Sequence, residues 1–249
     1  MRYFFIEQPA VGDPQLLITG SDARHIRTVL RLKSGDKIGL FDGQGFEYQA
    51  RIVAVSAGRV EVSVLQRFPV TAESPVQITI AQAFLKEKKM DRLVRQHTEL
   101  GISKWIPFFA KRSVPRPSKK NLSARMERWK KIAKETLKQC KRGCVPQIGE
   151  TATFEEVLNQ SQACDIKIAF WENESEPVNA PLPESELQIE KIFVLLGPEG
   201  GFTAEEIEQA RDRGFVTATL GPRILRAETA SLAACVLLQY LYGDMGKKW

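Results

Sequence analysis

Two glycine-rich stretches in the last third of the chain have residue types that can bind a small molecule. They are LLGPEGGFTAEE (Leu195–Glu206) and LGPRILRAETA (Leu220–Ala230). Glycine allows backbone angles that a Cβ forbids and lets a ligand approach the main chain. In each stretch a Gly-Pro pair follows an apolar run, which predicts two tight turns at the edge of a parallel sheet where ligands bind. The alternative is a pair of strand-to-helix turns without a ligand.

The residues of these stretches argue against the common phosphate-binding loops. Neither stretch has the Lys-Ser/Thr pair of a P-loop or the G-x-G-x-x-G dinucleotide pattern. Glu199 lies in the middle of the first stretch, where its carboxylate would repel a pyrophosphate. An adenosine-type ligand with a cationic centre fits better, with Leu196, Leu220 and Leu225 against its ring. S-adenosylmethionine is such a molecule.

Helix-start signals follow both stretches. Thr203 is expected to be an N-cap, with Glu206 at the capping-box position. Glu228 and Thr229 follow Arg226 where the last helix is expected to begin. They can contact a ligand, or they can serve only to start that helix.

Positive charge is concentrated in one segment. Of the net charge of +6, residues 111–142 carry +11, from thirteen Lys or Arg against Glu127 and Glu135, so the remainder sums to −5. Such a block is typical of a nucleic-acid partner, although a solvated helix face that binds nothing has the same pattern.

The composition is that of a folded protein without a membrane anchor. The 249 residues are 43% hydrophobic and 27% charged. The N-terminal MRYFFIEQP has only four consecutive apolar residues, too few for the core of a signal peptide. The apolar stretch of residues 230–242 is too short to span a bilayer. Four cysteines without C-x2-C spacing and two distant histidines favour reduced thiols, a cytoplasmic location and no metal.

The chain divides into a β-rich part, residues 1–70, and an α/β part, residues 75–249, separated by PVTAESP. The first part predicts a small β-barrel with a hairpin turn at residues 42–45. It also contains one helical insert. We expect Ser21 to cap this helix and the side chains of Val29 and Leu30 to face the core.

The second part alternates apolar runs with helical patterns, which predicts a mostly parallel sheet covered on both faces. The expected strands are VQITIAQA, KWIPFFA, DIKIAFW, KIFVLLG and FVTATLG. The expected helices are Lys89–Leu100, Leu122–Lys141, Thr203–Arg213 and Ala227–Tyr242.

Three ordered motifs then carry a resemblance to a known family. Gln82–Ser113, LLGPEGGFTAEEI and LGPRILRAETA, together with VLRLKSGDKI near the N-terminus, resemble the RsmE family of 16S rRNA uracil-N3-methyltransferases in the SPOUT superfamily. The resemblance implies an α/β SPOUT domain with a deep C-terminal trefoil knot, preceded by a PUA-like β-barrel. It also implies a homodimer that methylates one uridine of 16S rRNA in the small ribosomal subunit.

By this resemblance, the knot loops bind S-adenosylmethionine. The matching positions are Leu196, Gly197, Glu199, Gly200, Leu220, Gly221, Ile224, Leu225, Arg226, Thr229 and Ala230.

Methyl transfer to uracil N3 requires loss of the N3 proton, and a cation near O2 or O4 stabilises the resulting anion. Arg226 and Arg112 are the candidates for this cation, while Arg112 can alternatively bind phosphate. Glu228 and Glu199 are candidates for the general base, and solvent is the alternative.

A track of basic residues is expected to contact RNA phosphates. It comprises Arg24, Arg27, Arg31, Lys86, Lys88, Lys89, Arg92, Arg112, Arg116 and the 119–142 segment with Arg142. Two other functions fit parts of the pattern: a non-catalytic RNA-binding or ribosome-assembly protein, and a SPOUT enzyme that methylates ribose 2′-oxygens.

Overall fold

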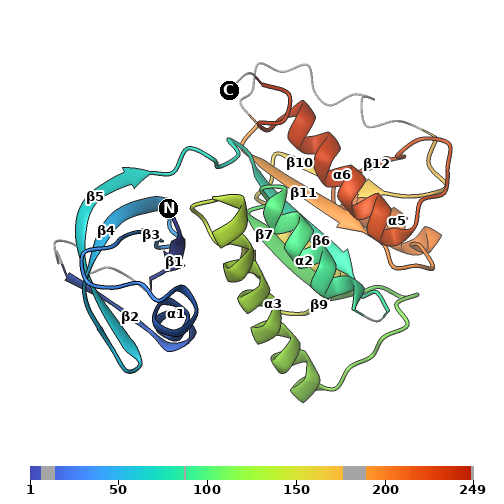
Figure 1. Cartoon of the computed structure of the whole chain (residues 1–249). Helices are drawn as coiled ribbons and strands as arrows, with labels where there is room; N and C mark the ends of the chain where they lie inside the picture. Colours follow the sequence, from blue (N-terminus) through green and yellow to red (C-terminus); the bar gives the residue numbers. More distant parts are fainter. Residues whose placement is uncertain (7–14, 87, 176–188, 248–249) are drawn as a thin grey trace. The chain divides into compact units, whose positions relative to one another are not determined.

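The computed structural model describes residues 1–6, 15–86, 88–175 and 189–247. The chain forms two compact units (Figure 1). The first comprises Met1–Glu73 and Lys134–Val145, and the second comprises Ser74–Ala133 and Pro146–Trp249.

The first unit is built on a five-stranded sheet in the order β1-β3-β4-β5-β2. Its strands are β1 (Tyr3–Phe5), β2 (Gln15–Thr19), β3 (Lys37–Phe41), β4 (Phe46–Ser56) and β5 (Arg59–Pro69). The β1–β3 pair is parallel and the other pairs are antiparallel. The expected β-rich architecture is therefore present. The pairing within the described residues runs from β1 to β2 without joining those two strands.

The β3–β4 hairpin has the predicted turn. Gly43 and Gly45 take positive φ angles of 73° and 99°, which residues with a Cβ rarely adopt. Asp42 Oδ1 accepts the backbone N–H of Gln44 at 2.8 Å, and its Oδ2 accepts the Tyr48 hydroxyl at 2.8 Å. Because Asp42 is buried, these bonds fix the turn against the core of the unit.

The helical insert differs from the prediction in its cap and in its buried face. It consists of α1 (Gly20–Arg24) followed by the π-helix η1 (His25–Leu30), and its N-cap is Thr19 rather than Ser21. Ala23 and Ile26 are buried and Leu30 packs against the core of the unit, as predicted for Leu30, whereas Val29 is 66% exposed. The wider π turn changes the angular spacing of the side chains, which the α-helical periodicity did not anticipate.

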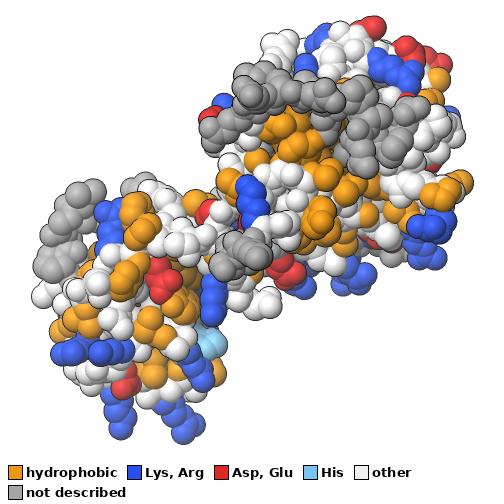
Figure 2. All heavy atoms as spheres, turned by 90° about the horizontal axis from the view of Figure 1, so that it is seen from above, with side chains coloured by type: hydrophobic (Ala, Val, Ile, Leu, Met, Phe, Trp, Pro, Cys, Tyr) orange, Lys and Arg blue, Asp and Glu red, His pale blue; other side chains and the backbone are white. Residues whose placement is uncertain are grey.

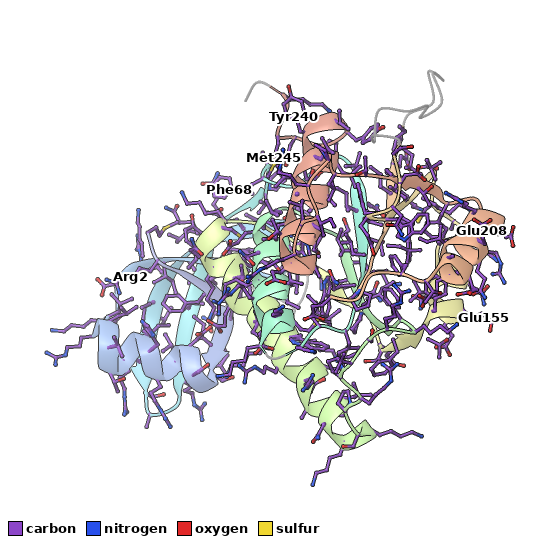
Figure 3. The ribbon with its side chains drawn as sticks, turned by 90° about the vertical axis from the view of Figure 1, so that its right-hand side faces the viewer. Arg2, Phe68, Glu155, Glu208, Tyr240 and Met245 are labelled. Carbon is purple, nitrogen blue, oxygen red and sulfur yellow. The ribbon has the colours of Figure 1, made fainter. Side chains whose placement is uncertain are left out.

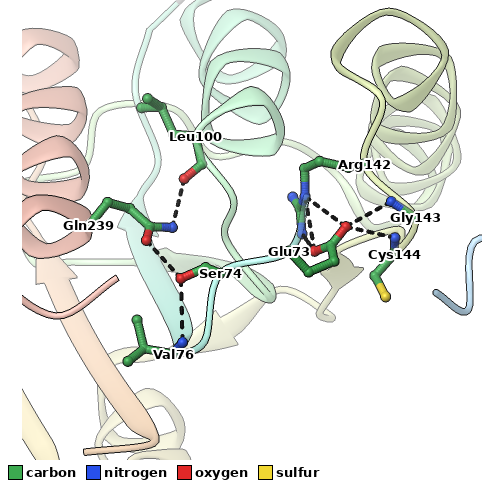
Figure 4. Close-up of polar contacts among 8 residues, drawn as sticks. All are labelled: Glu73, Ser74, Val76, Leu100, Arg142, Gly143, Cys144 and Gln239. Carbon is green, nitrogen blue, oxygen red and sulfur yellow. Dashed lines mark hydrogen bonds and ion pairs between the residues drawn. The ribbon is translucent and has the colours of Figure 1, made fainter. Parts of the chain in front are cut away.

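Residues 134–145 pack with the first unit, although they follow the expected domain boundary in sequence. The prediction placed all of residues 75–249 in one domain, but this segment belongs to the first unit. Lys138 Nζ lies 2.9 Å from Asp22 Oδ1. Arg142 Nη2 donates to Glu73 Oε2 at 2.7 Å, and Glu73 Oε1 accepts the N–H groups of Gly143 and Cys144 (Figure 4). These are contacts between distant parts of the chain, so no local pattern signals them.

The second unit contains a seven-stranded sheet. Its strands are β6 (Gln77–Ala83), β7 (Lys104–Phe109), β8 (Gln147–Ile148), β9 (Ala152–Thr153), β10 (Ile166–Phe170), β11 (Lys191–Leu196) and β12 (Val216–Ala218). The main order is β12-β10-β11-β6-β7-β8, with β9 also paired to β7, and every pair is parallel. The predicted parallel sheet is confirmed.

Helices cover both faces of this sheet, as predicted. They are α2 (Lys89–Glu99), α3 (Lys119–Cys140), α4 (Phe154–Gln160), α5 (Ala204–Asp212) and α6 (Ala227–Leu241). One face packs against α4 and α5 through a cluster that includes Phe108, Phe193 and Ile207. On the other face α2 and α6 lie side by side (Figure 1). The described residues contain no helix that is long and apolar enough to cross a membrane.

The start of the second unit is tied to its last helix. Ser74 Oγ donates to Gln239 Oε1 at 2.8 Å, and Gln239 Nε2 donates to the Leu100 carbonyl at 2.8 Å (Figure 4). Gln239 is fully buried, so these bonds satisfy its amide and fix the C-terminal half of α6 on the loop after α2.

Candidate active site

The carboxyl ends of three neighbouring strands place their loops at one edge of the parallel sheet. Phe170, the last residue of β10, is in register with Leu196 of β11 and with Ala218 of β12. The loops that follow these three strands therefore begin side by side at the same edge of the sheet. They include both glycine-rich stretches, as the sequence predicts.

These loops surround a cavity of about 810 Å³. Ten of the eleven residues predicted to bind the cofactor line it: Leu196, Gly197, Glu199, Gly200, Leu220, Gly221, Ile224, Leu225, Arg226 and Ala230. Thr229 is exposed in the first turn of α6 and is not part of the lining. A cavity of this size is in the range of small-molecule sites.

The loop after β10 forms a further wall that the sequence analysis missed. Phe170, Trp171, Glu172 and Glu174 line the cavity. Glu174 Oε2 accepts hydrogen bonds from the Thr217 hydroxyl and, at 3.0 Å, from Arg211 Nη2. Aromatic and acidic residues directly after a buried strand, FWENE, were the available signal.

The first glycine-rich loop is held by contacts from several elements. The predicted capping box is present, since Thr203 Oγ1 accepts the Glu206 N–H and Glu206 Oε2 accepts the Thr203 N–H. Arg112 Nη1 donates to the carbonyl of Gly200 at 2.9 Å and to that of Phe202 at 3.3 Å. Arg112 is thus engaged by the loop's main chain, which limits its availability to a substrate.

Lys89, at the first position of α2, pairs with a glutamate from each of the two other elements of the site. Its Nζ lies 3.1 Å from Glu199 Oε1 and 3.2 Å from Glu228 Oε2. The backbone N–H of Lys86 also donates to Glu199 Oε1, at 3.0 Å. This cluster was not foreseen, because Lys89 was expected on the RNA-binding surface.

The charges of the cluster stabilise one another. Burial raises the pKa of the Glu199 carboxyl, but the Lys86 N–H and the Lys89 ammonium outweigh it, so that pKa lies below its ordinary value. Burial also raises the pKa of Glu228, and hydrogen bonds and Lys89 again produce a net lowering. Burial lowers the pKa of Lys89, and the two carboxylates raise it above its ordinary value. All three groups are charged at neutral pH.

The second glycine-rich loop is open. Gly221 has φ 99° and no atom near the place of a Cβ. Ile224 is 87% exposed. Arg226 is the N-cap residue of α6, its side chain makes no capping bond, and it lines the cavity from an exposed position.

The predicted RNA-binding residues fall into two groups. Several are exposed, namely Arg24, Arg27, Arg31, Lys86, Lys88, Arg92 and Arg116. Three have partners within the protein: Lys89 pairs with two glutamates, Arg142 is buried against Glu73, and Arg112 donates to two carbonyls of the first glycine-rich loop.

The sequence of residues 72–239 matches the profile of an RNA methyltransferase domain, and residues 18–65 match that of an RNA methyltransferase PUA domain. The chain is 34% identical to ribosomal RNA small subunit methyltransferase E of Bacillus subtilis (strain 168), over 96% of each chain. It belongs to the ribosomal RNA small subunit methyltransferase E family.

Solved structures agree with membership of the ribosomal RNA small subunit methyltransferase E family. The Neisseria gonorrhoeae member bound to S-adenosyl methionine is 31% identical, with a TM-score of 0.87 over 98% of this chain and 99% of that one. A putative Legionella pneumophila methyltransferase in complex with the same cofactor is 29% identical, also with a TM-score of 0.87, over 98% and 100% of the two chains.

Proposed function

We propose that this protein transfers the methyl group of S-adenosylmethionine to N3 of one uridine in the 16S rRNA of the small ribosomal subunit. The observation that carries the proposal is the cavity of about 810 Å³ at the carboxyl ends of β10, β11 and β12. Its lining includes the glycine-rich loops of a family whose related structures hold S-adenosylmethionine.

The cofactor occupies this cavity in the proposal. The main chains of Gly197, Gly200 and Gly221 offer close approach to their N–H and C=O groups, and Leu196 and Leu225 offer apolar surface to the adenine ring. The site residues fit a sulfonium better than a phosphate, because four carboxylates and three basic side chains line the cavity and neither loop has the lysine of a P-loop.

The methyl transfer needs an in-line approach of uracil N3 to the sulfonium methyl, and orientation supplies much of the rate enhancement. We assign stabilisation of the uracil anion to Arg226, whose guanidinium is on the open loop beside the cavity. Arg112 is better suited to holding the first loop, since it binds the carbonyls of Gly200 and Phe202. The lowered pKa of Glu228 makes it a weak base, which favours solvent as the proton acceptor.

RNA binding is assigned to the exposed basic side chains. In the PUA unit, RNA phosphates are contacted by Arg24, Arg27 and Arg31. In the methyltransferase unit, they are contacted by Lys86, Arg92, Arg116 and the basic side chains of residues 119–131 of α3. Phosphate contacts of this kind position an RNA, while base contacts select it. The uridine has to be unstacked before its N3 can reach the methyl group.

We further propose that the chain after β12 passes through a trefoil knot and that two copies form a homodimer in the cytoplasm. β12 is at one end of the sheet, yet α6, which follows it, packs on β11 and β6, so the chain crosses back over its neighbours.

Exposed apolar side chains support the dimer. Val236, Tyr240 and Leu241 on α6 are each more than 40% exposed, and Met245 follows them (Figure 3). Figure 2 also shows hydrophobic side chains gathered at the surface of the larger unit. Contiguous apolar surface of this kind is typical of an interface.

The test incubates the purified protein with methyl-labelled S-adenosylmethionine and either small ribosomal subunits or naked 16S rRNA from cells that lack this enzyme. We expect label in 16S rRNA and none in the large-subunit rRNA used as control. Cofactor binding without transfer to either substrate contradicts the proposed activity, and absence of cofactor binding favours a non-catalytic RNA-binding protein.

A further inference from the structure

The lysine at the start of α2 lies in the cofactor cavity between two carboxylates that come from separate elements. Lys89, Glu199 and Glu228 all line the cavity, and their side chains are only 24–29% exposed. Glu199 comes from the loop after β11, and Glu228 comes from the first turn of α6. One ammonium group therefore links the first glycine-rich loop, the last helix and α2.

The balance of charge in this cluster is unequal. Two carboxylates and one ammonium leave one negative charge in this cluster. The full lining has the same balance, because it adds two cations, Arg223 and Arg226, and two carboxylates, Glu172 and Glu174. Partly buried charges interact more strongly than exposed ones, because less water screens them. A cationic atom of a ligand in the cavity would be attracted to this residual charge, whereas a neutral one would not.

We propose that Lys89 is a positioning residue for the cofactor: it holds Glu199 and Glu228 beside the cavity while leaving one net negative charge that favours a sulfonium over a neutral thioether. The proposal rests on the proposed function, since it assigns the cavity to S-adenosylmethionine. S-adenosylmethionine has the sulfonium, and the product S-adenosylhomocysteine has the thioether. The same charge therefore favours substrate binding and product release.

Lys89 also has a structural role within the proposal. Without its ammonium, Glu199 and Glu228 would repel each other across the wall that they share. Glu199 would keep its bond from the Lys86 N–H, whereas Glu228 would lose its ion-pair partner and keep only the attraction of Arg226. A purely structural salt bridge predicts that loss of any of the three side chains weakens both ligands alike.

The experiment measures binding of S-adenosylmethionine and S-adenosylhomocysteine by calorimetry and compares the ratio of the two affinities. In Glu199→Gln and Glu228→Gln, where the residual charge is removed, we expect the preference for the sulfonium to fall by about three- to tenfold. In Lys89→Met, where a second negative charge is left, we expect both affinities to fall and the preference for the sulfonium to rise. Opposite signs in the two kinds of variant are the signature of the proposal.

Lys104→Met is the matched control, because Lys104 lies in the same unit, donates to Gln160 Oε1 at 3.1 Å and does not line the cavity. We expect it to leave both affinities unchanged. If Lys89→Met does not fold, the affinity ratios of Glu199→Gln and Glu228→Gln still test the proposal. An unchanged ratio in all variants, with normal binding by the wild type, overturns this inference and leaves the proposed function intact. A wild type that binds neither ligand overturns both.

Discussion

The two glycine-rich loops share a Gly-Pro start and follow neighbouring strands of one sheet, yet they are held in very different ways. The loop of residues 197–203 is fixed by the Thr203 capping box, by Arg112 and by Lys89. Gln82 Nε2 adds a bond to the Gly197 carbonyl at 3.3 Å. The loop of residues 219–226 leads into α6 without a side-chain cap and exposes Ile224 and Arg226.

The difference indicates that the two loops have different functions. A fixed loop keeps the cofactor in one position, which favours an aligned methyl transfer. An open loop leaves the Arg226 guanidinium able to meet a base that enters from solution. The two loops share only their Gly-Pro start. The first loop is fixed by side chains of other elements that bond to it, Arg112 and Lys89 among them.

The largest effect is expected at the open loop. Arg226→Ala should lower the single-turnover rate by on the order of 10²-fold, because the uracil anion loses its cation, while the affinity for S-adenosylmethionine changes by about twofold or less. Rapid-quench assays and calorimetry measure the two quantities. Arg223→Ala, on the same loop, is the matched control and should lose much less. Equal losses in the two variants would remove the special role of Arg226.

Helix α6, which follows the open loop, is held to α2 by a contact between Ser231 and His97. His97 Nε2 lies 3.1 Å from Ser231 Oγ and 3.3 Å from the Ser231 carbonyl, and burial lowers the pKa of His97 to about 4.

Because the folded pKa of His97 lies below the ordinary 6.5, the unfolded state takes up the proton first as the pH falls. Stability is therefore present above pH 6.5 and is lost as the pH falls from 6.5 towards 4, by about 2 kcal/mol at pH 5. Urea unfolding at pH 7.5 and pH 5 measures this loss. His97→Gln should make the dependence clearly flatter, and an identical dependence in the variant would assign it to other groups.

Replacing a glycine by alanine should have different effects in the two loops. In Gly197→Ala the new Cβ would lie 3.3 Å from the ring of Phe202, which is buried in the core, so we expect a loss of about 1–2 kcal/mol and weaker cofactor binding. In Gly221→Ala nothing is within 4 Å, and only the strain of φ 99° remains.

Gly58→Ala, at φ 85° and equally open, is the control for that strain, because it lies in the other unit. Thermal unfolding with and without cofactor measures all three variants. A Gly221→Ala variant that loses clearly more stability than Gly58→Ala would contradict the open second loop, because strain alone predicts similar losses at the two positions.

The smallest effect concerns the helix caps. Thr203→Ala removes the side chain that accepts the Glu206 N–H, and we expect a loss of about 1 kcal/mol. Thr229→Ala, in the first turn of α6 but not at its N-cap, should leave stability nearly unchanged. Chemical denaturation measures both. Similar losses would show that α6 also depends on its first-turn threonine.

The sequence predicted those features that depend on local patterns. The long strands β6, β7, β10 and β11, helices α2, α3, α5 and α6, and the Thr203 cap follow from periodicity and capping rules. The strands β8 and β9, of two residues each, and the seven-residue α4 are too short for such patterns, although Thr153 and Glu156 form a capping box that could have been noticed.

Contacts between distant residues escaped prediction. The link from Lys89 to Glu199 and Glu228 joins residues more than 100 positions apart, and the bond from Arg112 to Gly200 joins residues 88 positions apart. The side-chain types alone therefore suggested RNA contacts for Lys89 and Arg142. Only the folded chain reveals that ion pairs engage both residues.

The central claim is that this site methylates N3 of uridine, and nucleoside mass spectrometry of the reaction product tests it most directly. Small ribosomal subunits from cells that lack the enzyme are incubated with the protein and S-adenosylmethionine, and their 16S rRNA is then digested. We predict 3-methyluridine with the wild type and almost none with Arg226→Ala. A different methylated nucleoside, such as a 2′-O-methyl ribose product, would contradict the claim while leaving the cofactor site in place.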